Sequence, residues 1–304
     1  MSILFHLIGL LWLLLPPLGT LSSVHPSRLK SSESLVREHR ELVELDIAYV
    51  VGTVAGRDSR GSGIAAQFRR SGRESKVGRR ASLILVDGSS VPRVVEPLSG
   101  AGETFGSSKL YERRLSFSRC TDTPIALSDT NSWRYQPFSP FTCKIMEGMC
   151  AAVEDSLPTY VAVVSEESLL RWDVFLDTLS SSLPGEKLIY TKSIPAGEHQ
   201  DGLPPHHYNP SHVGWYRLPT FNNSVVFSRD VASTLCKLYR AGPMVLYGPP
   251  ELWLGQVFMT LEMLNWVEAG EGENVGLENA KPGCDKGVTL VGFKTQRDWD
   301  SCPS

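Results

Sequence analysis

The 304-residue sequence lacks the signatures of several common functional classes. It contains no G-x-S-x-G motif, with which α/β-hydrolases expose a nucleophilic serine, and no Walker-type loop for nucleotide phosphates. None of its cysteines belongs to a C-x-x-C pair, so neither a zinc site nor a thiol redox centre is expected. The formal net charge is only −3 at pH 7, and without a strong overall field we predict no nucleic-acid partner.

The N-terminus also lacks charge, because the first 23 residues include no Asp, Glu, Lys or Arg. Their apolar stretch, Ile3–Leu15, ends at two prolines and is shorter than the roughly 20 apolar residues that span a bilayer comfortably. Small residues that a signal peptidase would accept follow it. We therefore expect residues 1–23 to direct the chain into the secretory pathway, to the lumen of the endoplasmic reticulum or Golgi. The segment is either a cleaved signal peptide or a signal anchor, which would make the chain a type II membrane protein.

The six cysteines fit such a compartment, because they are even in number and the secretory lumen is oxidising. The sequence does not choose among the possible pairings, although a bridge between Cys284 and Cys302 would staple the C-terminal tail. One glycosylation acceptor, Asn222-Asn223-Ser224, also fits a secretory protein.

Apolar runs typical of buried strands alternate with segments of helical periodicity between residues 41 and 268. The predicted strands are 41–53, 81–87, 122–129, 160–164 and 224–228, and the predicted helices are 143–153, 170–183, 231–239 and 252–266. This alternation predicts one α/β domain, an α/β/α sandwich around a mostly parallel sheet. Residues 57–80, rich in Arg, Gly and Ser, are expected to form a basic mobile surface loop or a contact site for an anionic partner. Residues 269–304 are expected to form a polar C-terminal tail.

Two adjacent carboxylates, Glu166 and Glu167, follow Ser165 at the end of the predicted strand 160–164. Open α/β sheets bind ligands where their strands end in this way. Two carboxylates can hold a hard divalent cation, which in turn neutralises a diphosphate. The alternative on local sequence alone is a solvated loop in which both side chains face water.

Motifs on both sides of these carboxylates follow one another in a definite order. After YVAVV come Ser165-Glu166-Glu167, Leu169-Leu170-Arg171 and FLDTLSSSLP. Upstream stand DTPIALSD, Asn131-Ser132-Trp133 and Phe141-Thr142-Cys143-Lys144, and downstream stand LPTF, Asn222-Asn223-Ser224, VVFSRDVA and Pro250–Gly255. In kind and order these motifs resemble those of the β-1,3-galactosyltransferase family, especially its protozoan phosphoglycan branch. The family carries an Asp-Asp-Asp motif where this chain has Ser165-Glu166-Glu167.

The resemblance implies a GT-A fold and inverting transfer of galactose or N-acetylglucosamine from a UDP-sugar donor to a glycan in β-1,3 linkage. It also implies Mn²⁺ as the cofactor, with Glu167 and Glu166 as the metal ligands. Ser165, Glu166 and Lys144 fall on positions that contact the donor; for Lys144, pairing with a buried acid is the alternative. Glu251 falls on the position of the catalytic base, and a carboxylate there can take the proton from an acceptor hydroxyl.

On the acceptor side the candidates are Trp215, Tyr216 and Asn223. The rings of Trp215 and Tyr216 can stack on a sugar, with packing in the core or at its rim as the alternative. The chain departs from the family pattern in two places: Ser165 supplies no charge, and Asn222-Asn223-Ser224 adds bulk where the family has glycines. These departures favour a second hypothesis, a catalytically impaired pseudo-glycosyltransferase that binds a glycan or a protein partner in the lumen.

Overall fold

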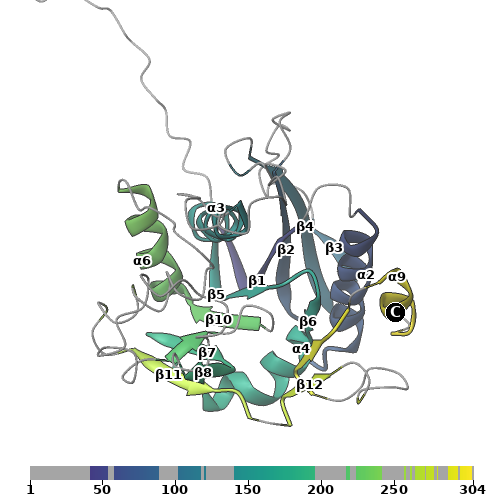
Figure 1. The fold of residues 1–304 in the computed structure, drawn as a ribbon. Helices are drawn as coiled ribbons and strands as arrows, with labels where there is room; N and C mark the ends of the chain where they lie inside the picture. Colours follow the sequence, from purple (N-terminus) through teal and green to yellow (C-terminus); the bar gives the residue numbers. More distant parts are fainter. Residues whose placement is uncertain are drawn as a thin grey trace, which may run out of the picture. The chain divides into compact units, whose positions relative to one another are not determined.

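An eight-stranded sheet forms the centre of the fold, in the order β11-β7-β10-β5-β1-β2-β4-β3 (Figure 1). The computed structural model describes residues 42–53, 58–88, 102–117, 120, 140–195, 217–219, 224–241, 257, 261, 264–270, 272–276, 279, 287–293 and 295–302. The strands of the sheet are β1 (Val43–Gly52), β2 (Arg80–Asp87), β3 (Glu103–Phe105), β4 (Ser108–Ser116), β5 (Ser156–Val164), β7 (Leu188–Thr191), β10 (Ser224–Ser228) and β11 (Asn265–Glu268).

The four neighbouring strands β5, β1, β2 and β4 are all parallel, and β11 is parallel to β7. Only β10 and β3 run antiparallel to their neighbours. Ile47–Val51 and Tyr160–Val164 are buried without interruption, as expected for parallel strands that are covered on both faces. The predicted α/β sandwich around a mostly parallel sheet is therefore confirmed, and so are four of the predicted strands. The strand predicted at 122–129 lies outside the described residues.

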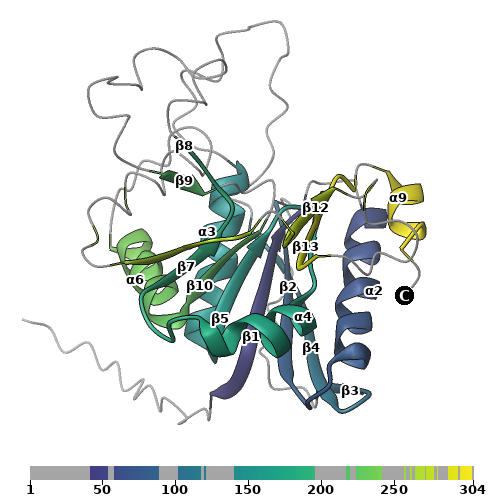
Figure 2. The ribbon, with the colours of Figure 1, turned by 90° about the horizontal axis from the view of Figure 1, so that it is seen from below.

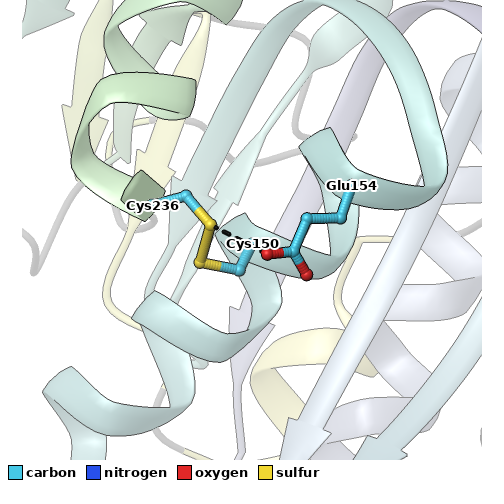
Figure 3. Close-up of side chains that lie close together, drawn as sticks. All are labelled: Cys150, Glu154 and Cys236. Atoms are coloured by element: carbon cyan, nitrogen blue, oxygen red, sulfur yellow. Dashed lines mark hydrogen bonds between the residues drawn. A yellow bond between two sulfur atoms is a disulfide. The ribbon is translucent and has the colours of Figure 1, made fainter. Parts of the chain in front are cut away.

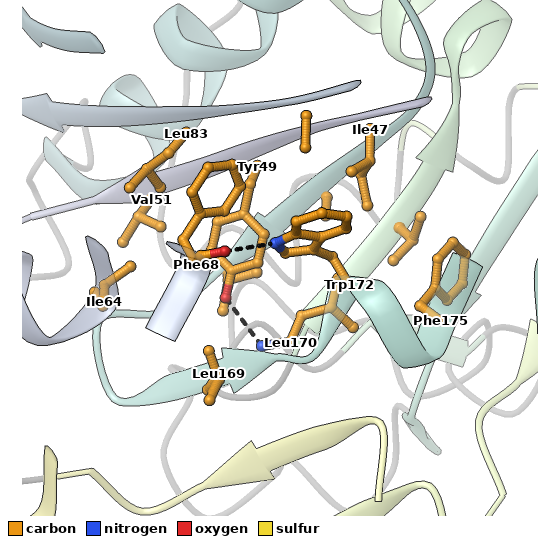
Figure 4. Close-up of a cluster of buried hydrophobic side chains, with 14 of the residues drawn as sticks. Ile47, Tyr49, Val51, Ile64, Phe68, Leu83, Leu169, Leu170, Trp172 and Phe175 are labelled. Atoms are coloured by element: carbon orange, nitrogen blue, oxygen red, sulfur yellow. Dashed lines mark hydrogen bonds between the residues drawn. The ribbon is translucent and has the colours of Figure 1, made fainter. Parts of the chain in front are cut away.

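Helices cover both faces of this sheet (Figure 2). The helical elements are α2 (Asp58–Glu74), α3 (Pro140–Asp155), α4 (Trp172–Val174), a π-helical turn (Phe175–Leu179), a 3-10 turn (Ser180–Ser182) and α6 (Arg229–Arg240). On one face, Met149 of α3 and Leu235 of α6 join one buried cluster. On the other face, Phe68 of α2 packs with Trp172 and Phe175 in a second cluster (Figure 4). The helices predicted at 143–153 and 231–239 are confirmed. The one predicted at 170–183 is confirmed in part: residues 172–182 are helical, as α4 and the two turns, whereas Leu170 ends a short strand.

The expectation of a mobile loop at 57–80 is wrong, because most of that segment is helix α2. Ile64, Ala65 and Phe68 lie on one face of the helix and are buried against the sheet. At the edge of this buried face, Arg69 forms a two-pronged ion pair with Glu112 of β4. The buried apolar face therefore stabilises a helix at a segment whose Gly, Ser and Arg content is typical of a loop.

The expectation of a polar tail at 269–304 is also wrong for the part that the structure describes. Strands β12 (Asn274–Gly276), β13 (Thr289–Val291) and β6 (Ser168–Leu170) form a second sheet, and α9 (Gln296–Asp300) follows. Leu290, Phe293 and Trp299 are fully or nearly fully buried in the same cluster as α2. The folded domain thus includes this segment, and Figures 1 and 2 both show α9 beside α2.

Residues 252–266 were expected to form a helix, and the structure differs at their end. Val257 is helical, but Trp266 lies on β11, which pairs in parallel with β7. On β11, at the edge of the sheet, Trp266 and Val267 are partly buried and Asn265 and Glu268 are exposed. The end of the predicted helix is therefore a strand instead.

Disulfides tie α3 to its surroundings, through Cys120–Cys143 and Cys150–Cys236. Cys302 is also disulfide-bonded, while Cys284, the partner that we expected for it, lies outside the described residues. No helix among the described residues is long and apolar enough to cross a membrane. Residues 1–23, expected to form the signal segment, are not among the described residues.

Candidate functional site

The carboxyl ends of β1 and β5 form a topological switch point of the sheet. From β1 the chain continues through α2 to β2 on one side, whereas β5, which follows α3, pairs with β1 on the other side. Open α/β sheets place their ligands outside the carboxyl ends of strands at such a point. Val51 of β1 and Val164 of β5 are register partners here, so the residues that follow these strands are neighbours.

Ser165, Glu166 and Glu167 form the turn that leaves β5. The Glu167 amide donates a hydrogen bond of 3.2 Å to the Ser165 hydroxyl oxygen, and the Ser168 amide donates one of 3.1 Å to the Ser165 carbonyl. Ser165, the first residue of the turn, thus stabilises the turn by accepting both hydrogen bonds. Glu166 is only 6% exposed, whereas Glu167 is partly exposed.

Lys144 lies at the same end of the sheet, although it comes from helix α3. Its side chain is 1% exposed, and its ammonium donates a hydrogen bond of 2.8 Å to the carbonyl of Thr53, the residue after β1. The structure therefore brings a buried cation to the end of β1 and two carboxylates to the end of the adjacent β5. Sequence reasoning missed Thr53, whose only signal was its place at the end of the first predicted strand.

Tyr49 of β1 also holds the chain that follows the turn. Its hydroxyl accepts a hydrogen bond of 2.9 Å from the Leu170 amide, as Figure 4 shows. Because Tyr49 is buried, the pKa of its phenol is raised above the usual value. The hydroxyl therefore stays neutral and acts here as a structural hydrogen-bonding group.

Strand β10 borders the turn on the side away from β1. Ser224 at its start pairs with Val164, and its hydroxyl lies 2.6 Å from the Thr289 hydroxyl of β13. Ser224 directly follows Asn223 in the sequence. Asn223 itself and the other predicted residues Trp215, Tyr216 and Glu251 lie outside the described residues, so their placement stays a prediction.

The turn offers oxygen ligands of the type that Mn²⁺ and Mg²⁺ accept in proteins. Among the described residues, no further His, Cys, Asp or Glu joins Glu166 and Glu167 to form a set of three ligands. A complete cage made by the protein is therefore not present in this part of the chain. Two carboxylates do fit a divalent cation that is shared with substrate phosphates, which commonly needs only one or two of them.

One group of three possible ligands does exist elsewhere in the described part of the chain, namely Cys150, Glu154 and Cys236 (Figure 3). The two cysteines form a disulfide, and a Glu154 carboxylate oxygen lies 3.3 Å from the Cys236 sulfur. Metal ions bind cysteine as the thiolate. This group is consequently a structural crosslink between α3 and α6 and not a metal site.

A separate groove of about 380 Å³ lies between α2 and β4. Leu83 and Leu85 line it together with the ion pair of Arg69 and Glu112. None of the predicted site residues borders it, and we therefore assign the candidate site to the switch point.

Comparisons with known proteins show a distant likeness to solved structures. No protein-family model matches the sequence, and no curated protein matches it. Among solved structures, the chain is similar to the galactosyltransferase LgtC in complex with donor and acceptor sugar analogues. The two are 9% identical with a TM-score of 0.46, over 84% of this chain and 95% of that chain.

Proposed function

We propose that the protein is a GT-A-type glycosyltransferase of the secretory pathway that transfers a hexose from a UDP-sugar to a glycan hydroxyl. The observation that carries the proposal is that Lys144 is bound to the residue after β1, while Glu166 and Glu167 follow the adjacent parallel strand β5. A cation and two carboxylates at a switch point are suited to a ligand that carries a diphosphate and a divalent metal. The order of motifs around them supports the hexosyltransferase assignment and the β-1,3 linkage.

In this proposal Glu167 and Glu166 would hold Mn²⁺ together with the donor diphosphate. The bound cation would supply charge neutralisation at the departing diphosphate. Lys144, already at the end of β1, adds a second positive charge to that end of the site. Ser165 shapes the turn through its hydroxyl oxygen and presents the two carboxylates.

For the transfer itself we assign Glu251 as the base. Its carboxylate takes the proton of the acceptor hydroxyl while the hydroxyl oxygen forms a bond to the anomeric carbon of the donor. The bond from that carbon to the diphosphate oxygen breaks, so UDP leaves with the electron pair and the configuration inverts. Trp215, Tyr216 and Asn223 are proposed to contact the acceptor.

A second candidate function is a pseudo-glycosyltransferase that binds a glycan or a protein partner without transfer. Two observations favour it: the Ser165 oxygen accepts the Glu167 amide within the turn, and Glu166 is nearly fully buried. The Ser165 hydroxyl and the buried Glu166 side chain can therefore both serve to stabilise the fold without a bound donor.

We also propose a lumenal location, with residues 1–23 as signal peptide or membrane anchor. The disulfides Cys120–Cys143 and Cys150–Cys236 support it, because such bonds persist in oxidising compartments.

Thermal unfolding of the full chain with UDP and Mn²⁺ tests both functions. A ligand at 100 times its dissociation constant adds about 2.7 kcal/mol to the free energy of unfolding, so millimolar UDP should raise the Tm only when Mn²⁺ is present. Glu167→Gln should weaken UDP binding by roughly tenfold or more, which is about 1.4 kcal/mol. Glu103→Gln, at an exposed position on β3, is the control and should bind like the wild type.

Transfer is measured separately, with UDP-galactose and UDP-N-acetylglucosamine against a panel of glycan acceptors. Binding with transfer supports the enzyme, and loss of transfer in Glu251→Gln with retained UDP binding supports its role as the base. Binding without transfer supports the pseudo-glycosyltransferase. No change of Tm at millimolar UDP and Mn²⁺ would contradict the donor site.

A further inference from the structure

The chain from Val288 to Cys302 contacts the Ser165–Ser168 turn directly. The amides of Gly292 and Phe293 both donate hydrogen bonds of 3.0 Å to the carbonyl oxygen of Glu167. Two consecutive amides can point at one oxygen because Gly292 has a φ of +106°, a conformation that other residues rarely adopt. Both lone pairs of the Glu167 carbonyl are thus held by the last part of the chain.

Strand β13 of the same segment borders the turn on two sides. It pairs antiparallel with β6, which begins at Ser168, with Val291 opposite Ser168 and Thr289 opposite Leu170. The Thr289 hydroxyl also lies 2.6 Å from that of Ser224, at the start of β10. Strand β13 therefore contacts both β6, which follows the turn, and β10, which lies beside it.

The segment is anchored at its far end on helix α2. Phe293 stacks on Trp299 with ring centroids 4.1 Å apart, and a side chain at Gly63 of α2 would come within 2.7 Å of the Trp299 ring. The Gln67 side chain donates to the Cys302 carbonyl, and Cys302 is held by a disulfide. These buried contacts give the segment a rigid support that is independent of the turn.

We infer that Gly292, Phe293 and Thr289 are positioning residues for the donor and metal site, acting through the main chain of Glu167 and Ser168. The inference rests on the proposed function, because it gives the residues a role in holding the carboxylates for UDP and Mn²⁺. A main-chain shift at Glu167 moves its carboxylate, and a metal site tolerates only small errors of ligand position. The segment expected to be a polar tail is on this view part of the site's supporting structure.

The test uses the full chain with Gly292→Ala, which forces an alanine to φ +106° and should disturb the paired amides. Gly106→Ala is the matched control, since Gly106 also has a positive φ of +61° but lies in the turn between β3 and β4. Thr289→Val is a milder second variant that removes only the hydroxyl contact with Ser224. Three quantities are measured: the Tm, amide hydrogen exchange in a peptide covering 165–170, and the Kd for UDP with Mn²⁺.

We expect Gly292→Ala to accelerate exchange in that peptide and to raise the Kd, each about tenfold relative to Gly106→Ala, and Thr289→Val to do the same to a smaller extent. Unchanged exchange or an unchanged Kd in both variants would overturn the inference. If the wild type binds no UDP with Mn²⁺, the proposed function fails and the positioning role falls with it. If Gly292→Ala nevertheless accelerates exchange in that case, the segment still holds the main chain of the turn in place, although the turn does not bind a donor.

Discussion

Gly148 of helix α3 packs directly against the sheet and permits a sharp test of that packing. A Cβ atom at this position would overlap Cγ1 of Val50 in β1 and lie 2.9 Å from Cγ2 of Val86 in β2. Atoms of this kind do not approach one another below about 3.0 Å, so Gly148→Ala requires either the helix or the strands to move.

The expected cost follows from two opposing terms. Overpacking a well-packed core costs about 1–3 kcal/mol, and replacing glycine by alanine inside a helix returns roughly 0.5–1 kcal/mol. Because the new Cβ would be too close to side chains of two strands, the cost should lie in the upper part of its range, about 2–3 kcal/mol. The net loss in the free energy of unfolding should then be about 1–2.5 kcal/mol, which corresponds to a fall in Tm of roughly 2–10 °C for a domain of this size. Gly185→Ala is the control, because a Cβ there meets nothing within 4 Å, and it should change stability by less than about 0.5 kcal/mol.

Urea denaturation of the two variants and the wild type measures these differences. A double variant adds Val50→Ala, which removes the methyl group that the new Cβ at position 148 would overlap. The penalty of Gly148→Ala should then be smaller in the Val50→Ala background than in the wild type. The reasoning would be refuted if Gly148→Ala were as stable as the wild type, or if its cost were the same in both backgrounds.

The same variant should also weaken UDP binding, since α3 carries Lys144 about one turn before Gly148. A helix displaced from β1 lengthens the hydrogen bond from Lys144 to the Thr53 carbonyl. A Kd for UDP that does not change while stability falls would contradict the expected link between the packing of α3 and donor binding.

Three further predictions concern buried groups. Tyr49→Phe leaves the Leu170 amide without its acceptor and should lower the free energy of unfolding by about 1–3 kcal/mol; a change below about 0.5 kcal/mol in urea denaturation would contradict this. Burial raises the pKa of Tyr49 and of Tyr190, so both phenols stay protonated in the fold while those of the unfolded chain ionise near pH 10. These two phenols should therefore not change the stability below about pH 10 and should lower it above that pH, with a shallower fall in Tyr49→Phe; a Tm that stays constant between about pH 9 and pH 11 would refute this. The double variant Cys150→Ser/Cys236→Ser opens a loop of 86 residues and should lose about 2–5 kcal/mol, whereas equal stability under non-reducing conditions would contradict a folding role for this bond.

Helix α2 shows why part of the fold could not be read from the sequence. Its glycines lower the helix propensity, and local patterning therefore indicated a loop. In the structure these glycines make room for neighbours: a Cβ at Gly63 would meet Trp299 at 2.7 Å, and one at Gly72 would meet Leu110 at the same distance. Tertiary contacts from distant parts of the chain thus stabilise a helix that its own residues do not favour.

The sequence by itself determined those helices and strands whose buried residues form a recognisable pattern within a single segment. The apolar runs of β1 and β5 and the helical spacing in α3 predict these elements, because a continuous apolar run or a period of 3.6 residues is visible within one segment. The end of β5 and its two glutamates were visible for the same reason.

Only the tertiary structure decided what surrounds those glutamates. The hydrogen bond from Lys144 to Thr53 spans 91 residues of sequence, and the bonds from Gly292 and Phe293 reach back to Glu167. Contacts between such distant residues depend on strand order and on the packing of helices, which leave no periodic pattern in either segment. The sequence therefore determined where the site begins, and the fold decided which residues hold it in place.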